Sequence, residues 1–220
     1  MSSARDEALA AIAEDPRLGV LYERSRALCD PTDPGHDVEH HLRVAGWTLR
    51  CASNDVDRVE AVAAALLHDV VNVPKDDPAR ASASAQSAAT ARVELIAVGF
   101  GAHAIERMAR AIEDHSYSRG QAPRSALGDA LQDADRLEAL GAIGLMRTFS
   151  TGAKMGAKYF CASDPFAEAR ELDDRRYTLD HFERKLLRLA ETMRTPRGRE
   201  EAERRTALMR AFVDAVALEL

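Results

Sequence analysis

The stretch that decides the fold is VDRVEAVAAALLHDV at residues 56–70. It is apolar on nearly every side of a helix, and such a helix is normally buried inside a larger protein. The polar pair His68 and Asp69 lies at its end, and Asn72-Val73-Pro74 follows as a stop. Burying an unpaired carboxylate is costly unless it pairs with a cation or coordinates a metal. The stretch therefore predicts a buried helix that ends in a functional pair.

Helical patterns continue on both sides of this stretch, and no segment has the alternation of a strand. Turn-forming residues at 30–35 and 120–123 separate the helices, and residues 150–176 look irregular. The fold class expected is all-α. We expect one domain over residues 1–220, with a core of about 18–150 and C-terminal helices of about 177–220 packed on it. The other helices are predicted at 3–14, 17–29, 37–53, 78–98, 102–115, 127–140, 142–149, 179–193 and 199–220.

Composition excludes several classes of protein. The chain has 220 residues, 46% of them hydrophobic, and a formal net charge of −6, which argues against binding to long nucleic acid. Cys29, Cys51 and Cys161 are few and scattered, so neither a disulfide framework nor a thiolate zinc site is expected. The N-terminal residues lack a signal sequence, and no apolar run approaches the roughly 20 residues of a membrane span. A cytoplasmic protein with no membrane partner is expected.

Three clusters of polar residues fall on otherwise apolar helices. HDVEHHLRV at 36–44 places His36, His40 and Arg43 on one helix face. LLHD at 66–69 and QDADRL at 132–137 add further histidine and aspartate residues. Imidazole nitrogen and carboxylate oxygen together suit a borderline divalent cation. Three helices that each offer such groups indicate a metal site inside a helical bundle.

In their order along the chain, HDxxHxxRV at 36–44, LLHD at 66–69 and DADRLEALGAIG at 133–144 resemble the HD-domain superfamily of metal-dependent phosphohydrolases. The resemblance is greater still to a small bacterial branch that includes nucleotide pyrophosphohydrolases. IEDHSYS at 112–118, MRTFS at 146–150 and HFERKLLRLAETMRTPRGREEAERR at 181–205 extend it over roughly 18–220. It implies an HD-domain helical bundle with the metal between helices.

The resemblance implies four metal ligands: His40, His68, Asp69 and Asp135. Asp135 is preferred over Asp133 because the family pattern is Asp-Arg-Leu. The expected cofactor is a divalent ion, Mn²⁺ first, with Mg²⁺, Co²⁺, Ni²⁺, Fe²⁺ or Zn²⁺ as alternatives.

Other residues are candidates for contact with substrate. Asp69, His115 and Lys75 are the catalytic candidates, and a solvated surface position is an equal alternative for Lys75. His36 is a candidate partner of the metal ligands, and Arg136 is expected to pair with a ligand carboxylate. The candidate substrate-binding residues are Arg43, Lys75, His115 and Lys185.

The expected reaction is metal-assisted hydrolysis of a phosphate ester or anhydride. By family analogy the expected substrate is a nucleoside triphosphate, cleaved to monophosphate and pyrophosphate. Residues 70–78 lack the Glu-Asp pair of the ppGpp-hydrolysing branch, and the chain lacks the Gly-Tyr-Pro signature of the cyclic-di-GMP branch. Two alternatives stay open: a phosphomonoesterase on nucleoside monophosphates or other small phosphates, and a metal-binding, ligand-sensing module without turnover. The expected partner is a small phosphorylated substrate, and a homodimer stays open.

Overall fold

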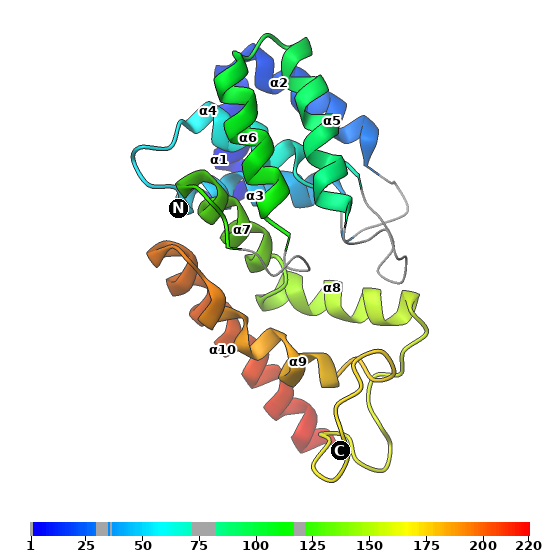
Figure 1. Ribbon diagram of the computed structural model, residues 1–220. Coiled ribbons are helices and arrows are strands. Elements are labelled where there is room, and N and C mark those ends of the chain that lie inside the picture. Colours follow the sequence, from blue (N-terminus) through cyan, green and yellow to red (C-terminus); the bar gives the residue numbers. More distant parts are fainter. Residues whose placement is uncertain (1, 30–34, 36, 72–81, 117–121) are drawn as a thin grey trace. The chain divides into compact units, whose positions relative to one another are not determined.

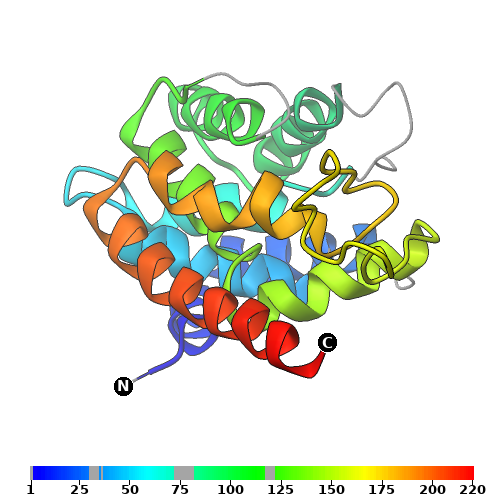
Figure 2. The same ribbon diagram turned by 90° about the horizontal axis from the view of Figure 1, so that it is seen from below.

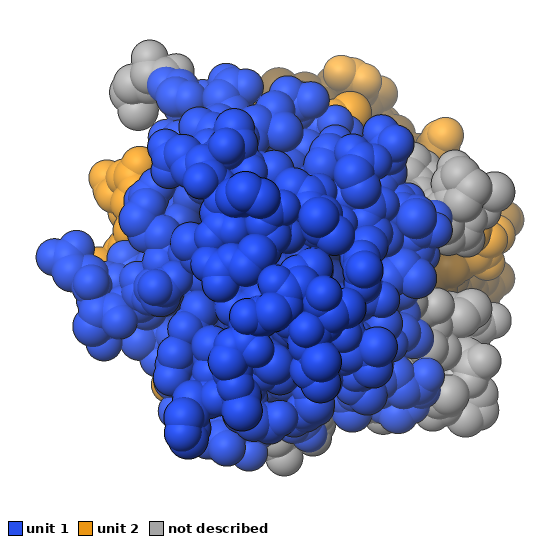
Figure 3. Space-filling view, turned by 90° about the horizontal axis from the view of Figure 1, so that it is seen from above, with its two compact units in different colours: residues 1–135 blue, residues 136–220 orange. Residues whose placement is uncertain are grey.

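The computed structural model describes residues 2–29, 35, 37–71, 82–116 and 122–220. In these ranges the regular elements are helices, beside one isolated bridge between Lys158 and Tyr177. The all-α class predicted from the sequence is confirmed. The chain forms two compact units, residues 1–135 and 136–220 (Figure 3). None of the described helices is long and apolar enough to cross a membrane.

Helix α4 (Arg58–Leu67), labelled in Figure 1, is the most deeply buried helix of the first unit. Every residue from 61 to 67 is fully buried, as its uniformly apolar sequence predicts. Neighbouring helices cover it on several sides, and α3 and α6 make the largest contacts with it. The remaining helices of this unit are α1 (Ala4–Glu14), α2 (Pro16–Leu28), α3 (Val38–Cys51), α5 (Ala83–Ala97), α6 (Ala102–Asp114) and α7 (Ala126–Leu137). Helix α7 extends two residues beyond Asp135, the last residue of the unit.

Short polar side chains fix where these helices begin. Asp57 accepts hydrogen bonds from the backbone N–H groups of Val59 and Glu60 and so caps α4. Asp37 caps α3 in the same way, through the N–H of His40. The cap at Asp37 fixes the first turn of α3, which carries His40.

Helix α1 packs closely on α3 because Gly46 has no side chain. A Cβ at Gly46 would overlap the backbone carbonyl of Ala4, which cannot move without shifting α1. We expect Gly46→Ala to lower the free energy of unfolding by about 1–3 kcal/mol, as overpacking does. That corresponds to a fall of roughly 2–4 °C in Tm per kcal/mol for a chain of this size.

The control for this prediction is Gly19→Ala on α2, where nothing lies within 4 Å of an added Cβ. There the better helix propensity of alanine should be neutral or stabilising, by up to about 1 kcal/mol. Thermal unfolding followed by circular dichroism measures both variants. Equal effects of the two substitutions would contradict the close α1–α3 packing.

The second unit is built around its last helix. Helix α10 (Pro196–Glu219) packs on α8 (Gly141–Lys154) and on the 3-10 helix η3 (Leu186–Thr192), as Figure 2 shows. The short helix α9 (Asp180–Arg184) precedes η3. Phe182 stacks on Phe212, with ring centroids 5.8 Å apart, and joins α9 to α10.

Two predicted helices of this unit differ from the structure. The single helix expected over 179–193 is broken at Lys185, and the part after it is a 3-10 helix. With three residues per turn, Leu186 and Leu189 lie on one side, and both are buried. The helix expected over 142–149 continues to Lys154. Gly152 lies inside this helix, at a position where an added Cβ would overlap the side chain of Thr178.

Candidate metal centre

Four side chains of the first unit form one cluster: His40, His68, Asp69 and Asp135. Each offers one nitrogen or oxygen atom, and all four atoms lie within 4.8 Å of one another. The histidines are fully buried, while the carboxylates are partly exposed. The structure thus brings together the four residues that the resemblance to the HD-domain superfamily implied as metal ligands.

Three helices supply these side chains. His40 lies in the first turn of α3, His68 and Asp69 follow the last turn of α4, and Asp135 lies near the end of α7. Nε2 of His68 is 3.7 Å from Oδ2 of Asp69 and 3.8 Å from Oδ1 of Asp135. Nε2 of His40 is 3.6 Å from the same Asp135 oxygen. These separations are too long for hydrogen bonds.

The hydrogen bonding of His68 shows that the cluster fits a cation. Its Nδ1 lies 2.7 Å from the carbonyl oxygen of Ala65, and a carbonyl can only accept, so Nδ1 carries the proton. Nε2 then has a lone pair when the ring is neutral. This buried atom has no hydrogen-bond partner among the residues that the structure describes. A metal ion is the partner that such an atom suits, with the Ala65 carbonyl orienting the ring.

Distances and local charge also suit a divalent ion. Metal–ligand bonds of about 2.0–2.2 Å place donors on opposite sides of an ion roughly 4.4 Å apart at most, so a small closure of this cluster would complete the site. The C-terminus of α4 ends at His68, and the negative end of its helix dipole favours a cation there. Two imidazoles with two carboxylates form a donor set for a borderline ion.

His115 lies beside this cluster and resembles His68 in its surroundings. It follows the last residue of α6, and its Nδ1 donates to the carbonyl of Ile112 at 2.6 Å. Its Nε2 faces Oδ1 of Asp69 at 3.3 Å, and the side chain is only 4% exposed. Burial disfavours the imidazolium, but the hydrogen bond to Asp69 and the charges of Asp69 and Asp135 outweigh it and raise the pKa of His115 to about 9.

The charge balance among these groups depends on the histidines. Burial alone would raise the pKa of Asp135, but the adjacent His68 and the charge of His115 hold it well below the usual range. A divalent cation between the carboxylates would act in the same direction on Asp135. It would oppose protonation of His115, since like charges repel.

His41 is a member of this histidine group that sequence reasoning missed. It is fully buried, its ring lies 5.1 Å from that of His68, and its Nδ1 is 2.7 Å from Oγ of Ser25. His41 directly follows His40, so the two side chains lie on different faces of α3. Both faces are buried, because α3 lies between α1 and α4. The only feature of the sequence that could have pointed to His41 is the adjacent pair His40-His41.

The other predicted residues are more scattered. Arg43 is half-buried on α3, one turn after His40. Lys185 belongs to the second unit, at the break between α9 and η3. Arg136, expected to pair with a ligand carboxylate, donates from Nη1 to the carbonyl of Thr192 at 2.8 Å. His36 and Lys75 lie outside the described residues.

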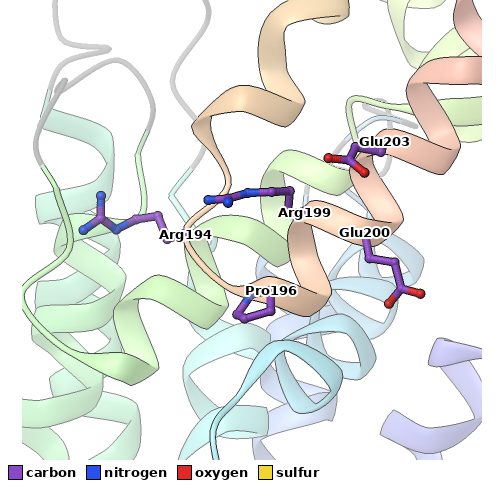
Figure 4. A pocket seen from close by; sticks show the side chains of 5 residues that line it. All are labelled: Arg194, Pro196, Arg199, Glu200 and Glu203. Carbon is purple, nitrogen blue, oxygen red and sulfur yellow. The ribbon is translucent and has the colours of Figure 1, made fainter.

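A pocket of about 340 Å³ lies at the start of α10 in the second unit (Figure 4). None of its lining residues belongs to the His/Asp cluster, and side chains of both charges line it. They are Arg194, Pro196, Arg199, Glu200 and Glu203. The arrangement has no buried polar group directed into it, so we assign it no catalytic role.

Comparison with known proteins identifies the family. The HD domain model matches residues 37–140. YpgQ of Bacillus subtilis, an uncharacterized protein, is 35% identical over 185 residues, which cover 81% of this chain and 82% of YpgQ. This chain belongs to the HD-domain family.

Solved structures of this family share the fold. The crystal structure of B. subtilis YpgQ in complex with ADP has a TM-score of 0.72 and 27% identity, and the match covers 97% of this chain and 96% of that chain. A HD-superfamily hydrolase from Bacillus thuringiensis has a TM-score of 0.68 and 27% identity, and covers 90% of this chain and 94% of its own. This chain is thus a HD-superfamily hydrolase of the phosphohydrolase class.

Proposed function

We propose that this chain hydrolyses nucleoside triphosphates to monophosphate and pyrophosphate with one divalent ion held by His40, His68, Asp69 and Asp135. The observation that carries the proposal is the four-residue cluster, whose ligand atoms lie within 4.8 Å of one another. The ADP bound to the similar B. subtilis YpgQ supports a nucleotide as the substrate. Mn²⁺ is the proposed ion, because two nitrogen donors make the set softer than an all-oxygen magnesium site.

An ion at this position would polarise a phosphoryl oxygen and increase the acidity of a water molecule beside it. The protein's part is to hold the donors in place. The Ala65 carbonyl keeps the Nε2 lone pair of His68 directed at the carboxylates, and the Asp37 cap fixes the first turn of α3 around His40. Donors fixed in this way need little rearrangement during the reaction.

His115 is the proposed proton-transfer residue. Its Nδ1 is committed to the Ile112 carbonyl, so Nε2 is the atom that can hold or release a proton next to Asp69. A proton held there can be given to an oxygen of the scissile phosphate group or of the leaving group. General acid catalysis of this kind contributes roughly 10²–10⁴-fold.

Basic side chains are proposed to balance the charge of the phosphates. Arg43 is the candidate within the first unit, since it follows His40 by one helical turn. Lys75 and Lys185 stay candidates on sequence grounds. An ammonium group acts on phosphate as a point charge. Replacing each of these basic residues tests its role through the change in KM and in kcat.

Product identification tests the proposed substrate. With Mn²⁺ present, we expect the purified protein to convert nucleoside triphosphates to monophosphate and pyrophosphate over many turnovers, and to leave monophosphates intact. Separation of the products by ion-exchange chromatography measures this directly. If monophosphates release orthophosphate as fast as triphosphates are cleaved, the result would favour the phosphomonoesterase. Metal binding without any turnover would favour the sensing module.

A further inference from the structure

Arg124, just before α7, meets two carboxylates at the end of α6, and the nearer is that of Asp114; Oε2 of Glu113 lies 3.7 Å from Nη2 of Arg124. Arg124 donates to the Asp114 carboxylate from Nη2 at 2.6 Å, from Nε at 2.9 Å and from its backbone N–H at 3.2 Å. Gln132, near the middle of α7, donates from Nε2 to the backbone carbonyl of Asp114 at 3.2 Å. The side-chain carboxylate and the backbone carbonyl of Asp114 thus both accept hydrogen bonds from the segment that leads to Asp135.

The burial of this pair is unequal. The side chain of Asp114 is 1% exposed, whereas that of Arg124 is 56% exposed. A buried carboxylate is costly to desolvate and needs its partner in place. Gly128 adds to the close fit, because a Cβ there would press on the side chain of Pro123. The carboxylate of Asp114 therefore links the end of α6, next to His115, to the segment that leads into α7, the helix that carries Asp135.

We propose that Asp114 and Arg124 are positioning residues that hold His115 against Asp69. His115 is the next residue in the chain after Asp114, where the regular helix has ended. Its ring is held by its bond to the Ile112 carbonyl, one turn back, and by Asp69. Fixing the backbone at Asp114 keeps this last turn closed, so that Nε2 of His115 stays directed at the carboxylate. The catalytic consequence rests on the function proposed for His115.

Chemical modification tests the positioning without relying on activity. In the manganese-loaded full chain we expect Arg124→Gln to raise the rate at which diethyl pyrocarbonate modifies His115 by roughly tenfold, equivalent to about 1.4 kcal/mol of lost stabilisation. His103, exposed on the same helix, serves as the internal reference and should react at an unchanged rate. Peptide mass spectrometry measures each histidine separately. A protected His115 would overturn the proposal, as would an equal rise at His40 and His68.

The matched control is Arg92→Gln. Arg92 also makes a bidentate ion pair with α6, through Glu106 at 2.9 and 3.0 Å, but in the N-terminal half of that helix. If positioning is specific, this variant should leave the modification of His115 unchanged. A rise in the control equal to that in Arg124→Gln would show general loosening and overturn the proposal.

A double-mutant cycle adds a kinetic test. Arg124→Gln should lower kcat when His115 is present. It should have little further effect when His115 is already alanine, because the two substitutions remove the same contribution. Additive losses would overturn the proposal. If His115→Ala alone leaves kcat unchanged, the proposed catalytic role of His115 fails, and the modification experiment still decides whether Arg124 holds the ring.

Discussion

Replacing Asp69 with alanine should abolish ion binding and activity together. Asp69 supplies an oxygen to the four-residue cluster and also faces Nε2 of His115, so one substitution removes two functions. We expect kcat/KM to fall by roughly 10³-fold or more, about 4 kcal/mol of transition-state stabilisation. Elemental analysis of the purified variant, beside steady-state kinetics, measures both losses.

The fold should survive this substitution. Asp69 and Asp135 repel each other when no cation separates them, so removing one carboxylate relieves a cost in the metal-free protein. Helical content by circular dichroism should therefore be unchanged. Asp55→Ala, at an exposed position of the same unit, is the matched control and should keep both metal and activity. An Asp69→Ala protein with full turnover would show that the ligand assignment is wrong.

Replacing His115 with alanine should separate chemistry from metal binding. His115 lies outside the group of four ligand atoms but within 3.3 Å of Asp69. We expect the variant to keep its ion and to lose roughly 10²-fold or more in kcat, the contribution of a group that transfers a proton. A rise in KM with kcat unchanged would instead show a residue that binds substrate and transition state equally.

The control for this variant is His103→Ala, an exposed histidine on α6, which should behave as wild type. Metal content must be measured for both. If His115→Ala loses the ion, His115 is a ligand and the four-residue centre has to be extended. That result would contradict the separation of roles between His68 and His115.

Sequence patterns predicted the first unit better than the second. In the first unit, apolar periodicity and capping aspartates such as Asp57 act locally, so helix positions follow from the sequence. In the second unit, packing decides more. Gly152 leaves the space that the side chain of Thr178 fills beside α8, and the 3-10 helix after Lys185 places Leu186 and Leu189 on one side. Neither contact is visible from spacing alone.

In the metal centre, too, some residues could be predicted from the sequence and others could not. The resemblance to the HD-domain family implied His40, His68, Asp69 and Asp135 as ligands, and the structure brings them together. Contacts between helices distant in sequence were not predictable, including Ser25 with His41. The ion pair of Asp114 with Arg124 crosses ten residues, and no local rule marks either one. Residues that position a site depend on tertiary contacts, whereas its ligands follow compact motifs.

The most direct test of the metal centre is anomalous diffraction from crystals of the manganese-loaded protein, measured at the manganese absorption edge. We expect one strong peak per chain, within bonding distance of His40, His68, Asp69 and Asp135, because these four side chains converge on one point. A peak beside other residues would contradict a phosphohydrolase built on this centre. So would the absence of a peak at the cluster, if the same protein is active without added metal.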